Sequence, residues 1–122
     1  MASSGSVVVD YKVYASVSEL SSEDLELVQA AHAAAWRAYA PYSNFHVGAA
    51  LRTSDGRVVT GNNQENASFP AGTCAERTAL HAAMSQDPGT VITTMAVIVP
   101  QVTGDRPVSP CGICRQALLE QE

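Results

Sequence analysis

A chain of 122 residues is long enough for one domain with a single hydrophobic core and too short for a second. It carries 7 Lys and Arg against 12 Asp and Glu and has no basic cluster, so we expect no nucleic acid polymer as a partner. No apolar stretch approaches the roughly 18 residues of a membrane span, and no signal peptide is recognisable, so a cytoplasmic protein without membrane contact is expected.

Residues 1–20 begin with small polar residues, and we expect a partly disordered N-terminal arm. The apolar run at residues 7–9 could add a short edge strand. Ser21 and the acidic residues after it are typical of a helix start. Apolar residues then recur at helical spacing up to Pro41, which should stop the helix: Leu25, Val28, Ala31, Ala35, Trp36 and Tyr39.

Two strands should follow, over residues 45–53 and 57–63, because both segments are rich in apolar and β-branched residues. The Asp55-Gly56 pair between them indicates a hairpin turn. Residues 62–73 have no periodicity and are rich in Asn, Ser, Gly and Pro, which predicts an irregular loop that delivers side chains to a site.

The second half of the chain predicts a helix, a strand and another helix. An Ala- and Leu-rich segment over residues 75–84 should be helical and end at residues 87–89, Asp-Pro-Gly. The continuous apolar run over residues 95–99 predicts a central strand. A polar loop over residues 101–108, with Gly104 and Asp105, leads to Pro110, where the last helix should start.

This order of elements predicts an α/β fold. A small sheet covered on both faces usually has more than three strands, and no Gly, Asn or Pro terminates the last helix before Glu122. We therefore expect C-terminal strands to be missing, so that the domain over residues 21–122 is truncated at its C-terminus.

The three cysteines form a pattern typical of a catalytic zinc site. Cys111 and Cys114 are three residues apart, so both sulfurs project from one side of a first helical turn, and Cys74 starts another helix. Three thiolates can bind one zinc ion and leave its fourth position open for water. Glu76, two residues after Cys74, is the natural candidate to move the protons of that water.

Other interpretations of the cysteines stay open at this point. The C-x-x-C pair alone could be a redox pair or half of a structural zinc knuckle. A closed structural site needs a fourth ligand, and the histidines are poor candidates. His81 would lie roughly 10 Å along the helix from Cys74, and His32 and His46 belong to other segments.

The chain resembles the small tetrameric zinc-dependent cytidine deaminases of the cytidine/deoxycytidylate deaminase family. Four blocks carry the resemblance, in family order over residues 21–119: PYSNFHVGAAL (41–51), NQENAS (63–68), TCAERTA (73–79) and SPCGICRQ (109–116). The resemblance implies a three-layer α/β/α sandwich with Zn²⁺ as cofactor.

The resemblance also implies roles for single residues. Cys74, Cys111 and Cys114 would bind the zinc, and Glu76 would move protons to N3 of the pyrimidine and to the departing amino group. The remaining roles concern the nucleoside and the thiolates: Asn63 and Glu65 would bind the ribose 3′-hydroxyl, Phe45 would pack beside the pyrimidine, and Arg77 would donate to the thiolates.

From the residues alone, three of these roles have simpler alternatives. Phe45 could be a core residue, Asn63 and Glu65 could be solvated loop residues, and Arg77 could be a surface charge. The segment over residues 99–110 is also somewhat long for the family.

The function implied by the resemblance is hydrolytic deamination of cytidine and deoxycytidine to uridine and deoxyuridine, with release of ammonia, in pyrimidine salvage. A cytoplasmic homotetramer acting on a small-molecule nucleoside would carry it out. One alternative is a deaminase of a modified cytosine nucleoside, such as an aminoacyl nucleoside antibiotic. Another is a non-catalytic interaction module stabilised by zinc.

Overall fold

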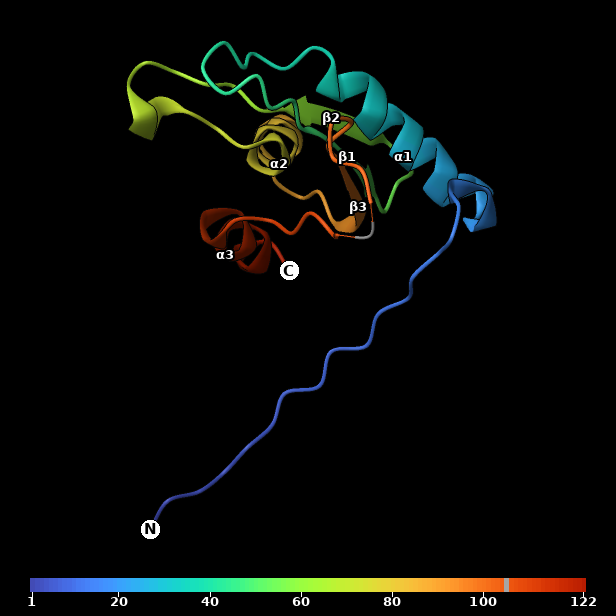
Figure 1. Cartoon of the computed structure of the whole chain (residues 1–122), viewed down its shortest axis with the longest axis vertical. Coiled ribbons are helices and arrows are strands. Elements are labelled where there is room, and N and C mark those ends of the chain that lie inside the picture. Colours follow the sequence, from blue (N-terminus) through green and yellow to red (C-terminus); the bar gives the residue numbers. More distant parts are fainter. Residues whose placement is uncertain (105) are drawn as a thin grey trace.

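The computed structural model describes residues 1–104 and 106–122, so the expectation for Asp105 lies outside the described residues. Residues 1–14 have no helix or strand, and Figure 1 shows this segment running away from the rest of the chain. The edge strand considered for residues 7–9 does not form, and its three valines are exposed. A short 3₁₀ helix, η1 (Val17–Glu19), precedes the first α-helix.

Helix α1 (Ser22–Ala35) begins as predicted, because the Ser21 side-chain oxygen accepts the backbone N–H of Asp24. The expected extension to Pro41 is wrong. The backbone at Tyr39 instead pairs with the segment after the second strand, donating to the Asn63 carbonyl at 3.0 Å. Trp36 and Tyr39 are therefore exposed, and the buried face of the helix consists of smaller residues: Leu27, Ala31, Ala34 and Ala35.

Three strands form one antiparallel sheet in the order β2-β1-β3: β1 (Gly48–Thr53), β2 (Val58–Asn62) and β3 (Ile92–Ile98). The predicted hairpin is confirmed, and Gly56 supplies the positive φ of 89° that its turn needs. The expectation that the apolar run forms a central strand is wrong, because among the described residues β3 pairs only with β1. A continuous apolar run indicates that the faces of a strand are covered, but it does not determine whether the strand lies in the middle or at the edge of the sheet.

Successive residues of β1 face opposite helices. Ala49 and Leu51 pack with α2 (Ala75–Gln86), whereas Ala50 packs with α1. Both helices approach the sheet backbone closely: a Cβ added at Gly48 would lie 1.9 Å from a carbonyl oxygen of α1, and one at Gly61 2.4 Å from a backbone nitrogen of α2. One helix on each face confirms the three-layer α/β/α arrangement (Figure 1).

The two remaining predicted elements are also present. Helix α2 ends at Gln86, next to the predicted Asp-Pro-Gly turn, and α3 (Gly112–Glu120) begins two residues after Pro110. Helix α3 packs against α2, and the segment between β2 and α2 is irregular except for η2 (Phe69–Ala71). None of the described helices is long and apolar enough to cross a lipid bilayer.

Candidate functional site

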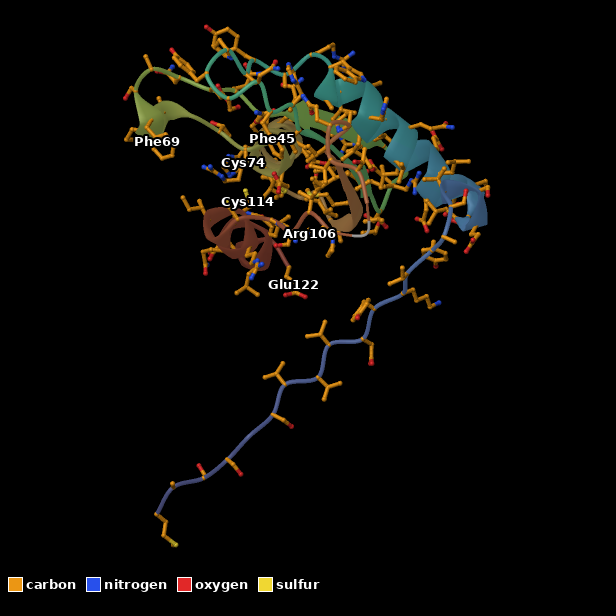
Figure 2. All side chains as sticks on the ribbon, viewed as in Figure 1. Phe45, Phe69, Cys74, Arg106, Cys114 and Glu122 are labelled. Atoms are coloured by element: carbon orange, nitrogen blue, oxygen red, sulfur yellow. The ribbon has the colours of Figure 1, made fainter. Side chains whose placement is uncertain are left out.

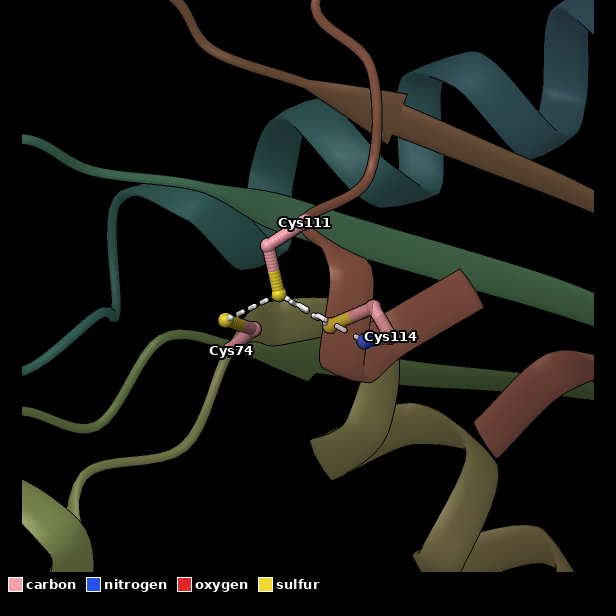
Figure 3. Close-up of side chains that lie close together, drawn as sticks. All are labelled: Cys74, Cys111 and Cys114. Atoms are coloured by element: carbon pink, nitrogen blue, oxygen red, sulfur yellow. Dashed lines mark hydrogen bonds between the residues drawn. The ribbon is translucent and has the colours of Figure 1, made fainter. Parts of the chain in front are cut away.

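Three cysteine sulfurs converge at the starts of α2 and α3. Cys74 is the N-cap of α2, Cys111 is the N-cap of α3, and Cys114 follows in the first turn of α3. The Cys111 Sγ lies 3.8 Å from the Cys74 Sγ and 3.4 Å from the Cys114 Sγ, and all three lie within 4.8 Å of one another (Figure 3). Tetrahedral zinc with bonds of about 2.3 Å to sulfur separates its ligands by about 3.8 Å. The donor set therefore fits Zn²⁺.

Hydrogen bonding and burial shift the pKa values of two of these thiols in opposite directions. The backbone N–H of Cys114 donates to the Cys111 Sγ at 3.4 Å, and this contact lowers the pKa of Cys111. Cys114 is fully buried, and burial raises its pKa to about 12. A metal cation that replaces the Cys114 proton compensates the buried negative charge.

Arg77 adds a positive charge to the cysteine cluster. Its Nη2 donates to the Cys74 Sγ at 3.7 Å, and the contacts with Cys74 and Cys114 raise the pKa of the guanidinium. Its Nε is buried and, in the part of the chain that the structure describes, has no hydrogen-bond partner. The half-buried guanidinium thus offsets part of the charge of three thiolates.

Glu76 lies in the first turn of α2, and only 6% of its surface is exposed. It stands two residues after Cys74, the N-cap of this helix, which places it at the same helix start as the cysteine cluster. Burial and the contact with Cys111 are the main causes of the raised pKa of Cys114, and the negative charge of Glu76 adds to them. The carboxylate is not among the atoms that converge as possible metal ligands. A buried carboxylate beside a metal site, but outside the ligand set, is suited to proton transfer.

A cavity of about 770 Å³ opens beside the cysteine cluster and has the size of a small-molecule site. Cys74, Arg77 and Cys111 contribute to its wall from the helix starts, and Tyr42 and Asn63 contribute from the other segments. In Figure 2, Cys74 and Cys114 lie between the ribbons of α2 and α3, and Phe69 marks the outer end of the loop that leads to α2.

Asn63 lines this cavity and also supports the loop before β1. Its Oδ1 accepts the backbone N–H of Val47 at 2.8 Å, and its Nδ2 donates to the carbonyl of Phe45 at 2.8 Å. These bonds add to the backbone hydrogen bond from the Asn63 N–H to the Val47 carbonyl at 3.3 Å, so Asn63 holds the backbone that carries Phe45.

Glu65 lines the cavity as well and holds the start of the same loop. Its Oε2 accepts the backbone N–H groups of Tyr42 at 2.9 Å and Ser43 at 3.2 Å, and its Oε1 accepts the Ser43 hydroxyl. The Ser43 hydroxyl is the main cause that lowers the pKa of Glu65, and the two backbone donors add to it.

The structure thus brings most of the sequence-predicted residues to one cavity, but not all of them. Phe45 is 42% exposed and is not among the described residues that line the cavity. Glu76 and Cys114 are buried and do not line it either. Tyr42 and Ser43 were missed, although both stand in the first block of family resemblance.

Comparisons with known proteins agree with this geometry. The family model described as "Cytidine and deoxycytidylate deaminase zinc-binding region" matches residues 21–122. A cytidine deaminase of Halalkalibacterium halodurans is 51% identical over 83 residues, which make up 68% of this chain and 60% of that protein. The chain therefore spans less than two thirds of that relative.

Solved structures support the same assignment. The cytidine deaminase of Burkholderia pseudomallei matches with a TM-score of 0.71 and 49% identity, over 79% of this chain and 74% of that one. The cytidine deaminase of Mycobacterium tuberculosis matches with a TM-score of 0.68 and 42% identity, over 79% of this chain and 75% of that one. The chain therefore belongs to the cytidine and deoxycytidylate deaminase family, and its three converging cysteines are able to hold the zinc ion of that family.

Proposed function

We propose that the protein catalyses the hydrolytic deamination of cytidine and deoxycytidine to uridine and deoxyuridine, with release of ammonia. One observation carries the proposal: three cysteine sulfurs within 4.8 Å of one another lie beside a cavity of about 770 Å³ and near the buried Glu76. Relatives named cytidine deaminase support the same reaction.

In this proposal Cys74, Cys111 and Cys114 hold the zinc ion. When bound, Zn²⁺ with one open position lowers the pKa of water and so supplies the nucleophile near neutral pH. Three thiolates would blunt that acidity through their negative charge. The Arg77 guanidinium, which donates to the Cys74 Sγ, opposes this effect.

Glu76 is the proton carrier of the proposed reaction. Its carboxylate takes the proton released by the attacking water and delivers it to N3 of the pyrimidine, so that C4 becomes more electrophilic. The water oxygen then bonds to C4, and Glu76 carries the remaining proton of that oxygen to the exocyclic amino nitrogen. The C4–N bond breaks, and the nitrogen leaves as ammonia. The burial of Glu76 supports this role because bulk water competes less for its proton.

Asn63 and Glu65 would bind the sugar while they hold the loop. A carboxylate has about four acceptor positions, and the loop uses three on Glu65, which leaves capacity on Oε1 for a hydroxyl group. Asn63 likewise keeps one N–H and one acceptor position. The exposed Phe45 would turn its ring toward the pyrimidine when a nucleoside binds.

Assembly and cellular context complete the proposal. A homotetramer is supported by apolar side chains beside the cavity, since Phe69 and Ile113 are 91% and 65% exposed and a second copy could cover them. Residues 1–20 would be an arm outside the catalytic domain, which the family match to residues 21–122 supports. The enzyme would act on free nucleosides in cytoplasmic pyrimidine salvage.

The test is to follow the ultraviolet absorbance change as cytidine becomes uridine, with zinc quantified in the same sample. Conversion that requires zinc is the expected result. Competition between cytidine and an aminoacyl cytosine nucleoside then identifies the preferred substrate. Zinc-replete, folded protein that converts neither compound would contradict the proposal and favour the non-catalytic zinc module.

A further inference from the structure

Residues 42–47 form a loop that belongs to no regular helix or strand, and its first two residues, Tyr42 and Ser43, line the cavity. Glu65 holds two backbone N–H groups at the start of this loop, and Asn63 holds one N–H and one carbonyl at its end. The middle of the loop, at Asn44 and His46, is held by a third side chain. That side chain is Gln101, which comes from the segment after β3.

Gln101 makes three contacts with the middle of the loop. Its Nε2 lies 2.9 Å from the Asn44 carbonyl oxygen and 2.8 Å from the His46 Nδ1, and its Oε1 accepts the His46 backbone N–H at 3.3 Å. A carbonyl can only accept, so Nε2 must be the atom that faces Asn44, and the His46 Nδ1 then accepts its second N–H. The Gln101 amide thus contacts His46 and Asn44, which lie 55 and 57 positions earlier in the chain.

A tight turn presents Gln101 to the loop. The backbone N–H of Val102 donates to the carbonyl of Val99 at 3.0 Å, and Pro100 occupies the second position of this turn, which its fixed φ favours. Val99, the first residue after β3, is buried and anchors the turn in the core. The turn after β3 therefore fixes the position of Gln101 independently of the loop that Gln101 holds.

The loop needs such a contact because Asn44 has a φ of 55°, in the left-handed region. Asn tolerates this region better than most residues, yet the conformation still costs free energy relative to an ordinary turn. The hydrogen bond from Gln101 to the Asn44 carbonyl favours this backbone conformation over its alternatives.

We infer that Gln101 is a positioning residue for nucleoside binding, because it fixes the middle of the loop that presents Tyr42 and Ser43 to the cavity and carries Phe45. The inference rests on the proposed function. Gln101 is not among the described residues that line the cavity, so it acts through the loop and not on the substrate. It also has no contact with the cysteine cluster among the described hydrogen bonds, so substrate affinity should change more than the chemical step.

The test compares Gln101→Ala with the unmodified zinc-loaded protein in two measurements. Steady-state kinetics should show a KM for cytidine raised about five- to tenfold, because hydrogen bonds to the loop are lost, with kcat within about twofold. Intrinsic fluorescence without nucleoside should also change. Trp36 is the only tryptophan, and its ring centroid lies 6.0 Å from that of His46, so its emission reports this side of the loop.

Two further variants control the experiment. Gln29→Ala removes an exposed glutamine from α1 and should change neither KM nor fluorescence. Gln101→Glu keeps the shape of the side chain but removes both N–H donors, so it should raise KM as Gln101→Ala does. Thermal unfolding midpoints of all variants verify that the fold is retained.

The two measurements separate the possible failures. Wild-type emission from Trp36 in Gln101→Ala would show that the contact does not hold the loop, and would overturn the inference even if the enzyme is active. A reduced kcat at unchanged KM would overturn it too. If the unmodified protein does not convert cytidine, the proposed function fails, and the role of Gln101 in nucleoside binding fails with it.

Discussion

Two walls of the cavity are positioned by different kinds of interaction. The cysteine wall comprises Cys74 and Cys111, which line the cavity, and the buried Cys114. It lies at two helix starts, where Cys74 and Cys111 are themselves the N-caps. The loop wall is the segment of residues 42–47, of which Tyr42 and Ser43 line the cavity, and it has no helix or strand of its own. It is held by side chains from the segments after β2 and β3, between 16 and 57 positions away in the chain.

The two walls also have different proposed roles, the cysteine wall in catalysis and the loop wall in substrate binding. A helix start is determined by a few consecutive residues, so the metal ligands stay in register as long as α2 and α3 form. The loop wall is held by several hydrogen bonds from distant segments of the chain. Substitutions at the cysteine wall should therefore change metal content or turnover, whereas substitutions at the loop wall should change affinity.

The largest effect is expected for Glu76→Gln, beside the cysteine wall. The amide cannot carry the protons, so kcat should fall by about 10³-fold or more, while zinc content and the unfolding midpoint stay close to those of the unmodified protein. Glu23→Gln is a matched control, since Glu23 occupies the same first-turn position in α1 but is exposed. Substantial turnover in Glu76→Gln would contradict the assigned role.

Cys111→Ala should remove one of the three proposed zinc ligands from the cysteine wall. Removing one of three sulfurs should weaken zinc binding by more than about 100-fold. A chelator should then no longer lower the unfolding midpoint, as it should in the unmodified protein. Metal analysis after dialysis and thermal unfolding with and without a chelator measure both effects. The exposed Ile113, between the two cysteines, provides the control: Ile113→Ala should keep its zinc. Full zinc content in Cys111→Ala would exclude Cys111 as a ligand.

Gly61→Ala tests the close contact between β2, which precedes Asn63 and Glu65, and α2, which begins at Cys74. An added Cβ would lie 2.4 Å from the nitrogen of Ala79 and 2.7 Å from the carbonyl oxygen of Ala75, so α2 must move away from β2. We expect a loss of about 1–3 kcal/mol in unfolding free energy, measured by urea denaturation. At Gly112, nothing lies within 4 Å of an added Cβ, so Gly112→Ala should lose much less stability. Equal stabilities would contradict the close approach of α2 and β2.

Glu65→Ala should act on the loop wall. It removes three hydrogen bonds to Tyr42 and Ser43, so KM for cytidine should rise about tenfold with a smaller change in kcat. Glu65→Gln retains an acceptor oxygen and should give an intermediate KM. An unaltered KM in Glu65→Ala would mean that the loop wall does not control binding.

The smallest expected effect is a dependence of stability on pH that arises from Glu65. Hydrogen bonds, the one from Ser43 first, lower its pKa below the ordinary value of 4.5. The contribution to stability is therefore complete above pH 4.5 and is lost as pH falls through the lower pKa of the folded state. Unfolding midpoints of the unmodified protein and Glu65→Gln, compared during acid titration, should converge at low pH. A constant difference would contradict this assignment.

The two walls also differ in how far the sequence predicts them. The spacing of Cys111 and Cys114 predicts their shared helical turn, and the Asp55-Gly56 turn is visible in the sequence too, because short-range geometry determines both features. Gln101 gives no local signal, since its role depends on a turn that is anchored in β3. The early end of α1 was missed for a similar reason: Tyr39 pairs with a distant segment instead of continuing the helix.

The alanine-rich core has a consequence for protein engineering. Between the helices and the sheet, eight alanines are completely buried, and any larger side chain there would push backbones apart: Ala31, Ala34, Ala35, Ala49, Ala50, Ala75, Ala79 and Ala83. The spacing between metal ligands and sheet therefore cannot be adjusted gradually by resizing core residues. A library that aims at other nucleosides should vary residues 42–47 and the turn at Gln101, and leave the helix-sheet contacts untouched.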